Sequence, residues 1–239
     1  KKGMEKPYIF GAVAVGCVVA YQLISSQKSN QQTKKKKAYQ PNGEVAQRIA
    51  AVTPYYPFKG IDRFYDIGGF LKNPDVFQQA VDVFVDRYKD VEFDSIGGFD
   101  ARGFVLGPPL ALALKKPFFM LRKKGKMPNA VSGKKYSKEY VSSAGDDVLC
   151  LQRDAVKAGD KVLLIDDLVA TGGTLCAGVE LVTQFGGKVV ECACIVEIKA
   201  LNARKKFENM GFSQVPIWAL LSEEIMSLKG ELHDHYVDD

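Results

Sequence analysis

The pattern of apolar and polar positions in residues 41–239 alternates between short continuous apolar runs and longer segments with helical spacing. Apolar runs of about four to eight residues are typical of strands, whereas a repeat of three to four is typical of amphipathic helices. An alternation of the two predicts an α/β fold with a mainly parallel sheet flanked by helices. Strands are predicted at 95–99, 117–121, 148–151, 161–165, 188–197 and 215–220, and helices at 44–52, 74–88, 103–114, 174–185 and 201–209.

One apolar run near the N-terminus stands apart from this alternation. Residues 7–26 carry no charge and are mostly apolar. At ~1.5 Å per helical residue, about 20 residues reach across the ~30 Å hydrocarbon layer of a bilayer. We therefore expect a single transmembrane helix at 7–26, followed at 27–40 by a flexible basic linker rich in Ser, Gln, Asn and Lys. Residues 41–239 then form one globular domain.

Two other interpretations of the apolar run remain open, namely a cleaved targeting segment and a core helix. Lysines flank the run on both sides, and the side that carries Lys28 and Lys34 to Lys37 is the more positive. This asymmetry favours an intracellular, membrane-anchored protein whose domain lies on the cytosolic or mitochondrial matrix side. It also allows a place in a larger membrane complex.

The charge of the chain is concentrated in the same region. Residues 1–37 contain eight of the 33 basic residues but one of the 28 acidic residues, which leaves 25 basic and 27 acidic residues in the remainder. A general nucleic-acid-binding domain would show a dominant basic surface, so we expect no nucleic-acid partner. The five cysteines include no Cys-x-x-Cys pair, which favours a reducing compartment.

The most informative segment runs from Val162 to Thr174. Four branched aliphatic residues predict a strand buried on both faces, and Asp166 and Asp167 follow it at the sheet edge where ligands of α/β folds bind. The small residues Ala170, Thr171, Gly172, Gly173 and Thr174 then open a helix, so backbone N–H groups can close around a phosphate, and Thr174 can cap that helix. The two carboxylates suit the diol of a ribose or the water shell of Mg²⁺. A plain turn with solvated carboxylates is the competing interpretation.

Cations follow two other predicted strands. Arg102 comes after the strand at 95–99 and just before a Gly-opened helix, where its planar fork of donors can clamp an anion. Arg122, Lys123 and Lys126 begin a polar segment that continues to Gly145 without clear periodicity. These cations favour pyrophosphate binding over a merely solvated loop, and the length of the segment favours a mobile lid.

These motifs, in this order and spacing, resemble those of the type I phosphoribosyltransferases and most closely the adenine-specific members of that family. The similarity extends from about Tyr55 to Phe207 and includes Ser137-Lys138-Glu139-Tyr140. It implies the type I phosphoribosyltransferase fold with a small N-terminal hood, and transfer of the phosphoribosyl group of phosphoribosyl pyrophosphate (PRPP) to adenine. AMP and pyrophosphate are the products, in purine salvage, with Mg²⁺ as cofactor and a homodimer as the assembly.

The resemblance also implies residue roles. Asp166 and Asp167 hold the ribose hydroxyls, with Mg²⁺ bound through PRPP and through water to Asp166 rather than directly to protein. Arg102 is catalytic, and Glu139 is the acid or base at the purine nitrogens. The pyrophosphate-binding residues are Arg122, Lys123, Lys126 and Tyr140. The adenine-binding residues are Ile61, Arg63 and Phe64, in a loop that varies within the family.

The chain departs from the family pattern at the lid. Val141 follows Tyr140 where the family usually has a glycine, and 142–145 look inserted. The expected N-terminal anchor is not a usual family feature either, and two further hypotheses stay open. In the first hypothesis, the chain is a catalytically silent subunit of a membrane complex. In the second, it is an enzyme that acts on hypoxanthine, guanine or orotate in place of adenine.

Overall fold

The computed structural model describes residues 9–136 and 147–231. The strands of its larger sheet are β3 (Ser95–Phe99), β4 (Phe118–Lys123), β5 (Ala130–Tyr136), β6 (Asp147–Gln152), β7 (Lys161–Val169), β8 (Lys188–Glu197) and β9 (Ile217–Ser222). The helices are α1 (Ile9–Ala38), α2 (Glu44–Ala51), α3 (Gly68–Leu71), α4 (Pro74–Tyr88), α5 (Gly103–Leu114), α6 (Gly173–Gln184) and α7 (Ala203–Asn209), with short 3₁₀ helices η1 (Lys199–Leu201) and η2 (Glu223–Ile225).

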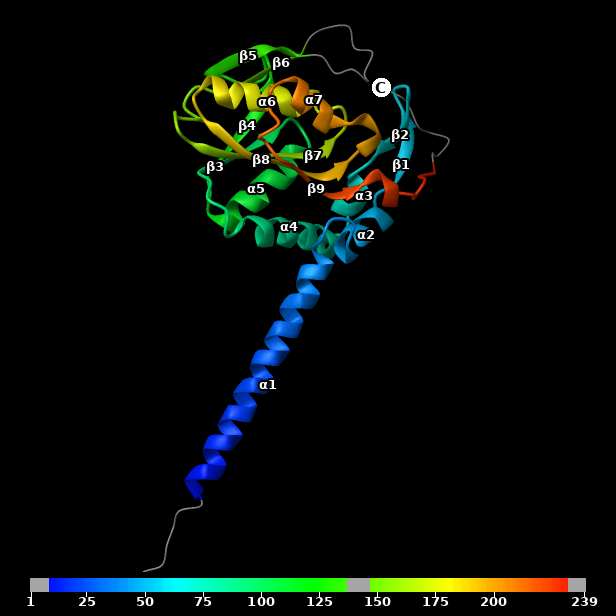
Figure 1. Cartoon of the computed structure of the whole chain (residues 1–239). Helices are drawn as coiled ribbons and strands as arrows, with labels where there is room; N and C mark the ends of the chain where they lie inside the picture. Colours follow the sequence, from blue (N-terminus) through cyan, green and yellow to red (C-terminus); the bar gives the residue numbers. More distant parts are fainter. Residues whose placement is uncertain (1–8, 137–146, 232–239) are drawn as a thin grey trace, which may run out of the picture.

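The sheet is mainly parallel, as predicted. Its seven strands lie in the order β5-β6-β4-β3-β7-β8-β9 (Figure 1). The neighbouring strands in the run β4-β3-β7-β8-β9 pair in parallel, whereas β6 pairs antiparallel with both β4 and β5. The carboxyl ends of β3, β7 and β8 therefore meet at one edge, which is where ligands of such sheets bind.

Helices cover both faces of the sheet because the central strands are apolar on both sides. In β7, Leu163 and Ile165 pack in the core that includes α2, α4 and α5, whereas Val162 and Leu164 pack in the core that includes α6 and α7. All four side chains are fully buried. This strict alternation fixes the register of β7 and so fixes where its carboxyl end delivers Asp166 and Asp167.

The predicted hood is a separate antiparallel hairpin of β1 (Tyr55–Phe58) and β2 (Ile61–Tyr65). Two aromatic pairs across the hairpin stabilise it: Phe58 with Phe64, whose ring centroids are 5.0 Å apart, and Tyr55 with Tyr65, at 6.1 Å. The sequence predicted a loop here, because the aromatic residues show no clear alternation and Pro57 lies among them.

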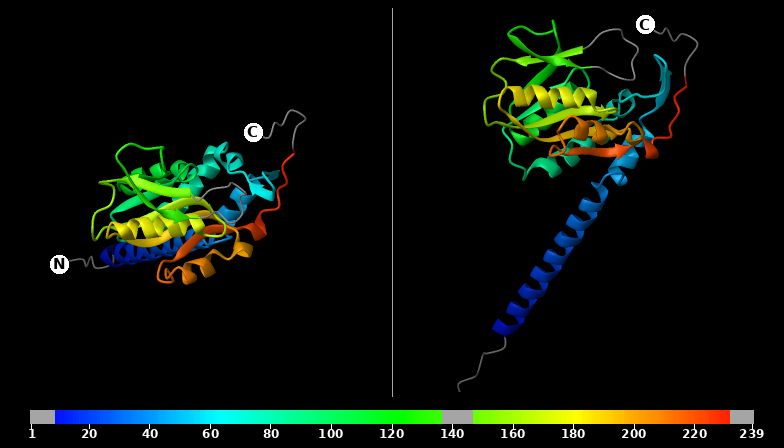
Figure 2. Two further views of the ribbon diagram at one scale, coloured as in Figure 1. Left: turned by 90° about the horizontal axis from the view of Figure 1, so that it is seen from above. Right: turned by 45° about the horizontal axis from the view of Figure 1, so that its top comes forward.

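The N-terminal region differs from the prediction. Helix α1 continues to Ala38, so residues 27–38 are helical where a flexible linker was expected. Residues 17–40 contain neither Gly nor Pro, and their Lys, Gln and Ala residues favour helix. The helix projects from the body of the protein (Figure 1 and the right-hand view of Figure 2).

The transmembrane helix predicted at 7–26 is not supported. Within the part of the chain that the structure describes, no helix combines the length and the apolar content needed to cross a bilayer. The side chains of α1 that are described, from Ile24 onward, are mostly polar and exposed up to Lys37.

The segment expected to be a lid is only partly irregular. After the turn at 124–129 the chain forms β5, which pairs with β6 at the edge of the sheet. A polar edge strand with one neighbour lacks the apolar run that marks a central strand, which explains why the sequence did not reveal it. Residues 137–146, which include Glu139 and Tyr140, lie outside the described residues.

Candidate active site at the carboxyl edge of the sheet

Strand β7 extends further than predicted, to Val169, so Asp166 and Asp167 lie within the strand, near its carboxyl end. The chain then turns through Gly172, whose φ of +83° is the left-handed conformation that glycine adopts without steric cost. Helix α6 begins at Gly173, and no side chain caps it. The prediction that Thr174 caps this helix is therefore wrong, and Thr174 instead lies in its first turn.

A pocket, which we call the phosphate-loop pocket, is lined by residues 100–102 and 166–175. It contains Arg102, both carboxylates and every residue of the predicted phosphate loop from Ala170 to Thr174. The first N–H groups of α6 have no partner within the helix, and they point toward its amino end. The pocket therefore combines an anion-binding helix terminus with two carboxylates that can accept hydroxyl groups.

The two carboxylates differ in their surroundings. Asp167 is 2% exposed, whereas Asp166 is partly exposed and its Oδ1 accepts a hydrogen bond of 2.9 Å from the backbone N–H of Asp167. Burial raises the pKa of Asp166 well above its usual value, and the neighbouring Asp167 adds to this. Burial also raises the pKa of Asp167, although Arg102 opposes the shift. Both carboxylates therefore gain from a partner that can donate hydrogen bonds or positive charge.

Arg102 supplies one such partner. Its Nη1 lies 2.9 Å from Oδ2 of Asp167, and its guanidinium lies 5.1 Å from the centre of the Phe64 ring. The buried Oδ2 still accepts no well-aligned hydrogen bond from the described residues, so the approach of Arg102 is an ion contact. Arg102 thus spans from the carboxylates to the hood.

A second pocket, the hood pocket, lies on the other side of Arg102. The hairpin contributes Gly60 to Tyr65, including the predicted adenine-binding residues Ile61, Arg63 and Phe64. Arg102, Leu168 and Ala170 line both pockets, so the two adjoin. The guanidinium of Arg63 lies 5.0 Å from the ring centre of Tyr55, which holds it against the hairpin.

Sequence reasoning missed the opposite wall of the hood pocket. That wall consists of Ile198, Ala200, Leu201 and Glu223, from the segments that follow β8 and β9. One signal was available: both segments follow parallel strands, and loops at this edge line ligand sites. Their composition carries no motif, however, so the sequence did not mark them.

The predicted pyrophosphate-binding cations lie at the rim rather than inside the phosphate-loop pocket. Nε of Arg122 donates a 3.0 Å hydrogen bond to Oδ2 of Asp100, and its Nη1 donates to the carbonyl oxygen of Lys126 at 3.0 Å. Nζ of Lys126 lies 3.8 Å from the same Asp100 oxygen, and Lys123 is exposed at the end of β4, next to Arg122. Asp100 lines the pocket, so Arg122 and Lys126 border it through Asp100.

Comparison with known proteins shows which family the chain belongs to. Residues 66–221 match the model of the phosphoribosyl transferase domain. An adenine phosphoribosyltransferase of Triticum aestivum is 42% identical over 180 residues, which cover 75% of this chain and 93% of the relative. The chain belongs to the adenine phosphoribosyltransferase family. A relative from Neisseria meningitidis is also 42% identical, over 76% of this chain and 92% of its own length.

The fold comparison extends this membership to the spatial arrangement. The adenine phosphoribosyltransferase of Trypanosoma brucei, solved in complex with AMP, pyrophosphate and ribose-5-phosphate, superposes with a TM-score of 0.74 at 32% identity. The superposition covers 80% of this chain and 86% of that one. The two adjoining pockets therefore lie in a fold that the chain shares with this family.

Proposed function

We propose that this chain transfers the phosphoribosyl group of PRPP to adenine, giving AMP and pyrophosphate. The observation that carries the proposal is that the phosphate-loop pocket and the hood pocket adjoin and share Arg102, Leu168 and Ala170. One pocket has the donors and acceptors for a phosphorylated sugar, and the other has an aromatic and aliphatic lining suited to a flat base. Group transfer between two substrates requires this proximity.

The phosphate-loop pocket would hold the sugar phosphate. The backbone of Ala170 to Gly173 and the hydroxyl groups of Thr171 and Thr174 would bind the 5′-phosphate. Asp166 and Asp167 would accept hydrogen bonds from the ribose hydroxyls, and Oδ2 of Asp167 accepts no aligned hydrogen bond from the described residues. A buried acceptor of this kind gains most from a ligand that donates to it.

The hood pocket would hold adenine against Phe64 and the backbone of Ile61, with Arg63 nearby. The purine nitrogen attacks the ribose C1 atom, the bond from C1 to the pyrophosphate oxygen breaks, and the purine nitrogen gives up its proton. Arg102, Arg122, Lys123 and Lys126, together with Tyr140 from the undescribed segment, would stabilise the charge of the departing pyrophosphate. Glu139, also in that segment, would exchange the proton with the base.

Asp166 and Asp167 fit a role beside Mg²⁺. Mg²⁺ usually binds one or two carboxylates, keeps several waters and takes its other ligands from substrate phosphates. When bound, it would neutralise charge on the pyrophosphate. We further propose, from the family resemblance, that the active assembly is a homodimer.

A base-specificity assay tests the proposed function. The full chain is incubated with Mg²⁺, PRPP and one of adenine, hypoxanthine, guanine or orotate, and the nucleotide product is measured. We expect AMP from adenine and little product from the other bases. Turnover of guanine without adenine would refute the specificity, and PRPP binding without turnover of any base would favour the silent-subunit hypothesis.

A further inference from the structure

One wall of the hood pocket is an exposed segment that needs support from elsewhere. Ile198, Ala200 and Leu201 follow the end of β8, and Leu201 is 43% exposed. A short exposed segment has few buried contacts to fix it, so its conformation depends on specific hydrogen bonds. We propose that Glu223 is the positioning residue that fixes this wall and thereby sets the affinity of the pocket for its base. The proposal rests on the proposed function, because it takes the hood pocket as the base site.

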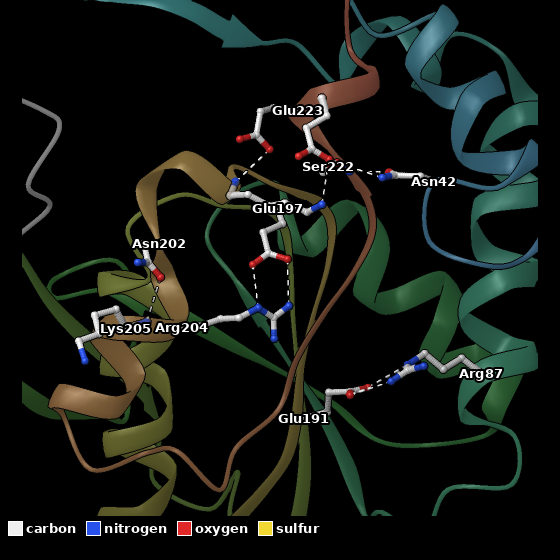
Figure 3. Close-up of polar contacts among 11 residues, drawn as sticks. Asn42, Arg87, Glu191, Glu197, Asn202, Arg204, Lys205, Ser222 and Glu223 are labelled. Atoms are coloured by element: carbon white, nitrogen blue, oxygen red, sulfur yellow. Dashed lines mark hydrogen bonds and ion pairs between the residues drawn. The ribbon is translucent and has the colours of Figure 1, made fainter.

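Glu223 holds the backbone of the wall directly. Its Oε2 accepts a hydrogen bond of 2.9 Å from the N–H of Lys199, and its Oε1 accepts one of 3.0 Å from the N–H of Ala200 (Figure 3). Each carboxylate oxygen of Glu223 thus accepts a hydrogen bond from one of two successive N–H groups. Hydrogen bonds to an ionised carboxylate are about twice as strong as neutral ones, and Glu223 is only partly exposed.

The ends of the wall are fixed as well. At its start, Glu197 forms a two-pronged ion pair with Arg204, with distances of 3.1 and 2.9 Å (Figure 3). At its end, Asn202 caps helix α7 by accepting a hydrogen bond from the N–H of Lys205. Between these ends, the N–H groups of Leu201 and Asn202 donate within η1, and Glu223 accepts from the N–H groups of Lys199 and Ala200.

Glu223 is itself held in place by the N-terminal side of the domain. The N–H of Ser222 donates to Oδ1 of Asn42 at 2.9 Å, and Nδ2 of Asn42 donates to Oγ of Ser222 at 3.0 Å (Figure 3). This reciprocal pair fixes the residue that precedes Glu223. The wall, the end of β9 and the residue Asn42 just after α1 thus form one connected hydrogen-bonded network.

The adjacent carboxylate offers a matched control. Oε2 of Glu224 accepts from Nζ of Lys199 at 2.9 Å and from Oγ of Ser222 at 3.0 Å. Glu224 therefore contacts the side chain of Lys199, whereas Glu223 contacts its backbone. Glu224 does not line the hood pocket, so replacing it removes a neighbouring charge without releasing the wall.

The test compares Glu223→Gln, Glu223→Ala and Glu224→Gln in the full chain. An amide at position 223 keeps one acceptor oxygen and turns a donor toward a backbone N–H, so the wall loses one of its two hydrogen bonds. We expect Glu223→Gln to raise KM for adenine about tenfold, with KM for PRPP and kcat within about twofold of the wild-type values. Glu223→Ala should have the larger effect, and Glu224→Gln should leave both KM values unchanged.

A second measurement does not depend on turnover. Amide hydrogen exchange at Lys199 and Ala200 should be faster in Glu223→Gln than in the wild type, and unchanged in Glu224→Gln. An unchanged adenine KM in an active Glu223→Gln variant, or equal rises in both KM values, would overturn the positioning role alone. A wild-type chain that turns over no base would instead overturn the proposed function, and this inference with it.

Discussion

The negative charge of the Asp166 carboxylate does not stabilise the folded chain. Burial and Asp167 raise its pKa well above the usual value. Between the unfolded pKa, about 3.9, and this raised value, the folded chain binds more protons than the unfolded chain. The free energy of unfolding therefore falls as the pH rises through that window, and the full penalty is present above it.

Asp166→Asn should remove this penalty. We expect the free energy of unfolding to rise by on the order of 1 kcal/mol at pH 7 and to match the wild-type value below about pH 4. Urea denaturation at the two pH values measures it. Asp90→Asn, at an exposed position after α4, should change stability by less than about 0.5 kcal/mol at both. The same Asp166 variant should bind PRPP more weakly, and a stability gain that persists at pH 4 would contradict the argument.

Glu139 calls for a kinetic rather than a thermodynamic test. If it exchanges a proton with the base during transfer, Glu139→Ala should lower kcat by about 10²-fold or more, because general acid or base catalysis contributes about 10²- to 10⁴-fold. The KM for PRPP should change little, since a group that transfers a proton in the transition state need not contribute to ground-state binding of PRPP. Steady-state kinetics with PRPP varied at saturating adenine separates the two. An unchanged kcat would refute the role.

At the scale of elements, the sequence predicted what depends on local pattern and missed what depends on neighbours. The central strands and α4 to α7 carry periodic apolar residues, and the structure confirms them. Strand β5 is an edge strand without a long apolar run, and the β1–β2 hairpin is half-exposed. The predicted phosphate loop is continuous in sequence, and its residues line one pocket. The wall at Ile198 to Leu201, held by Glu223, comes together only in the folded chain, and the sequence did not reveal it.

The turn into α6 yields an element-scale prediction with a close control. Gly172 and Gly211 have φ values of +83° and +79°, so alanine at either position adopts a left-handed conformation that costs roughly 1–2 kcal/mol. A Cβ at Gly172 would also lie 3.0 Å from Cβ of Ala203, whereas one at Gly211 meets no atom within 4 Å. We expect both variants to lose stability, Gly172→Ala the more.

Their effects on PRPP should separate more clearly than their stabilities. Gly172 lies in the phosphate-loop pocket and Gly211 does not, so only Gly172→Ala should raise the KM for PRPP, by about tenfold. Thermal unfolding and steady-state kinetics on the two purified variants provide the comparison. Equal KM values for PRPP in both would mean that the geometry of this turn does not govern phosphate binding.

At the scale of the whole molecule, the projecting helix and the domain are joined through a short stretch of chain. Residues 24–37 of α1 are exposed, whereas Ala38 and Tyr39 pack against the core that includes α2 and α4. Asn42 then binds Ser222 at the end of β9. Because Lys35 already contacts Asp86, we expect the boundary between the chain that the domain needs and the chain that it does not need to fall between Lys34 and Asn42.

Two truncations on either side of that boundary test it. Removing residues 1–33 should leave the thermal midpoint within a few degrees, and kcat/KM for adenine within about twofold, of the values for the full chain. This truncation removes exposed helix and retains the contact of Lys35 with Asp86. Removing residues 1–42 also deletes Tyr39 and Asn42, which releases Ser222 beside Glu223. We expect a lower thermal midpoint and a raised KM for adenine with the KM for PRPP nearly unchanged. If both truncations behaved alike, the N-terminal contacts would have no part in shaping the hood pocket.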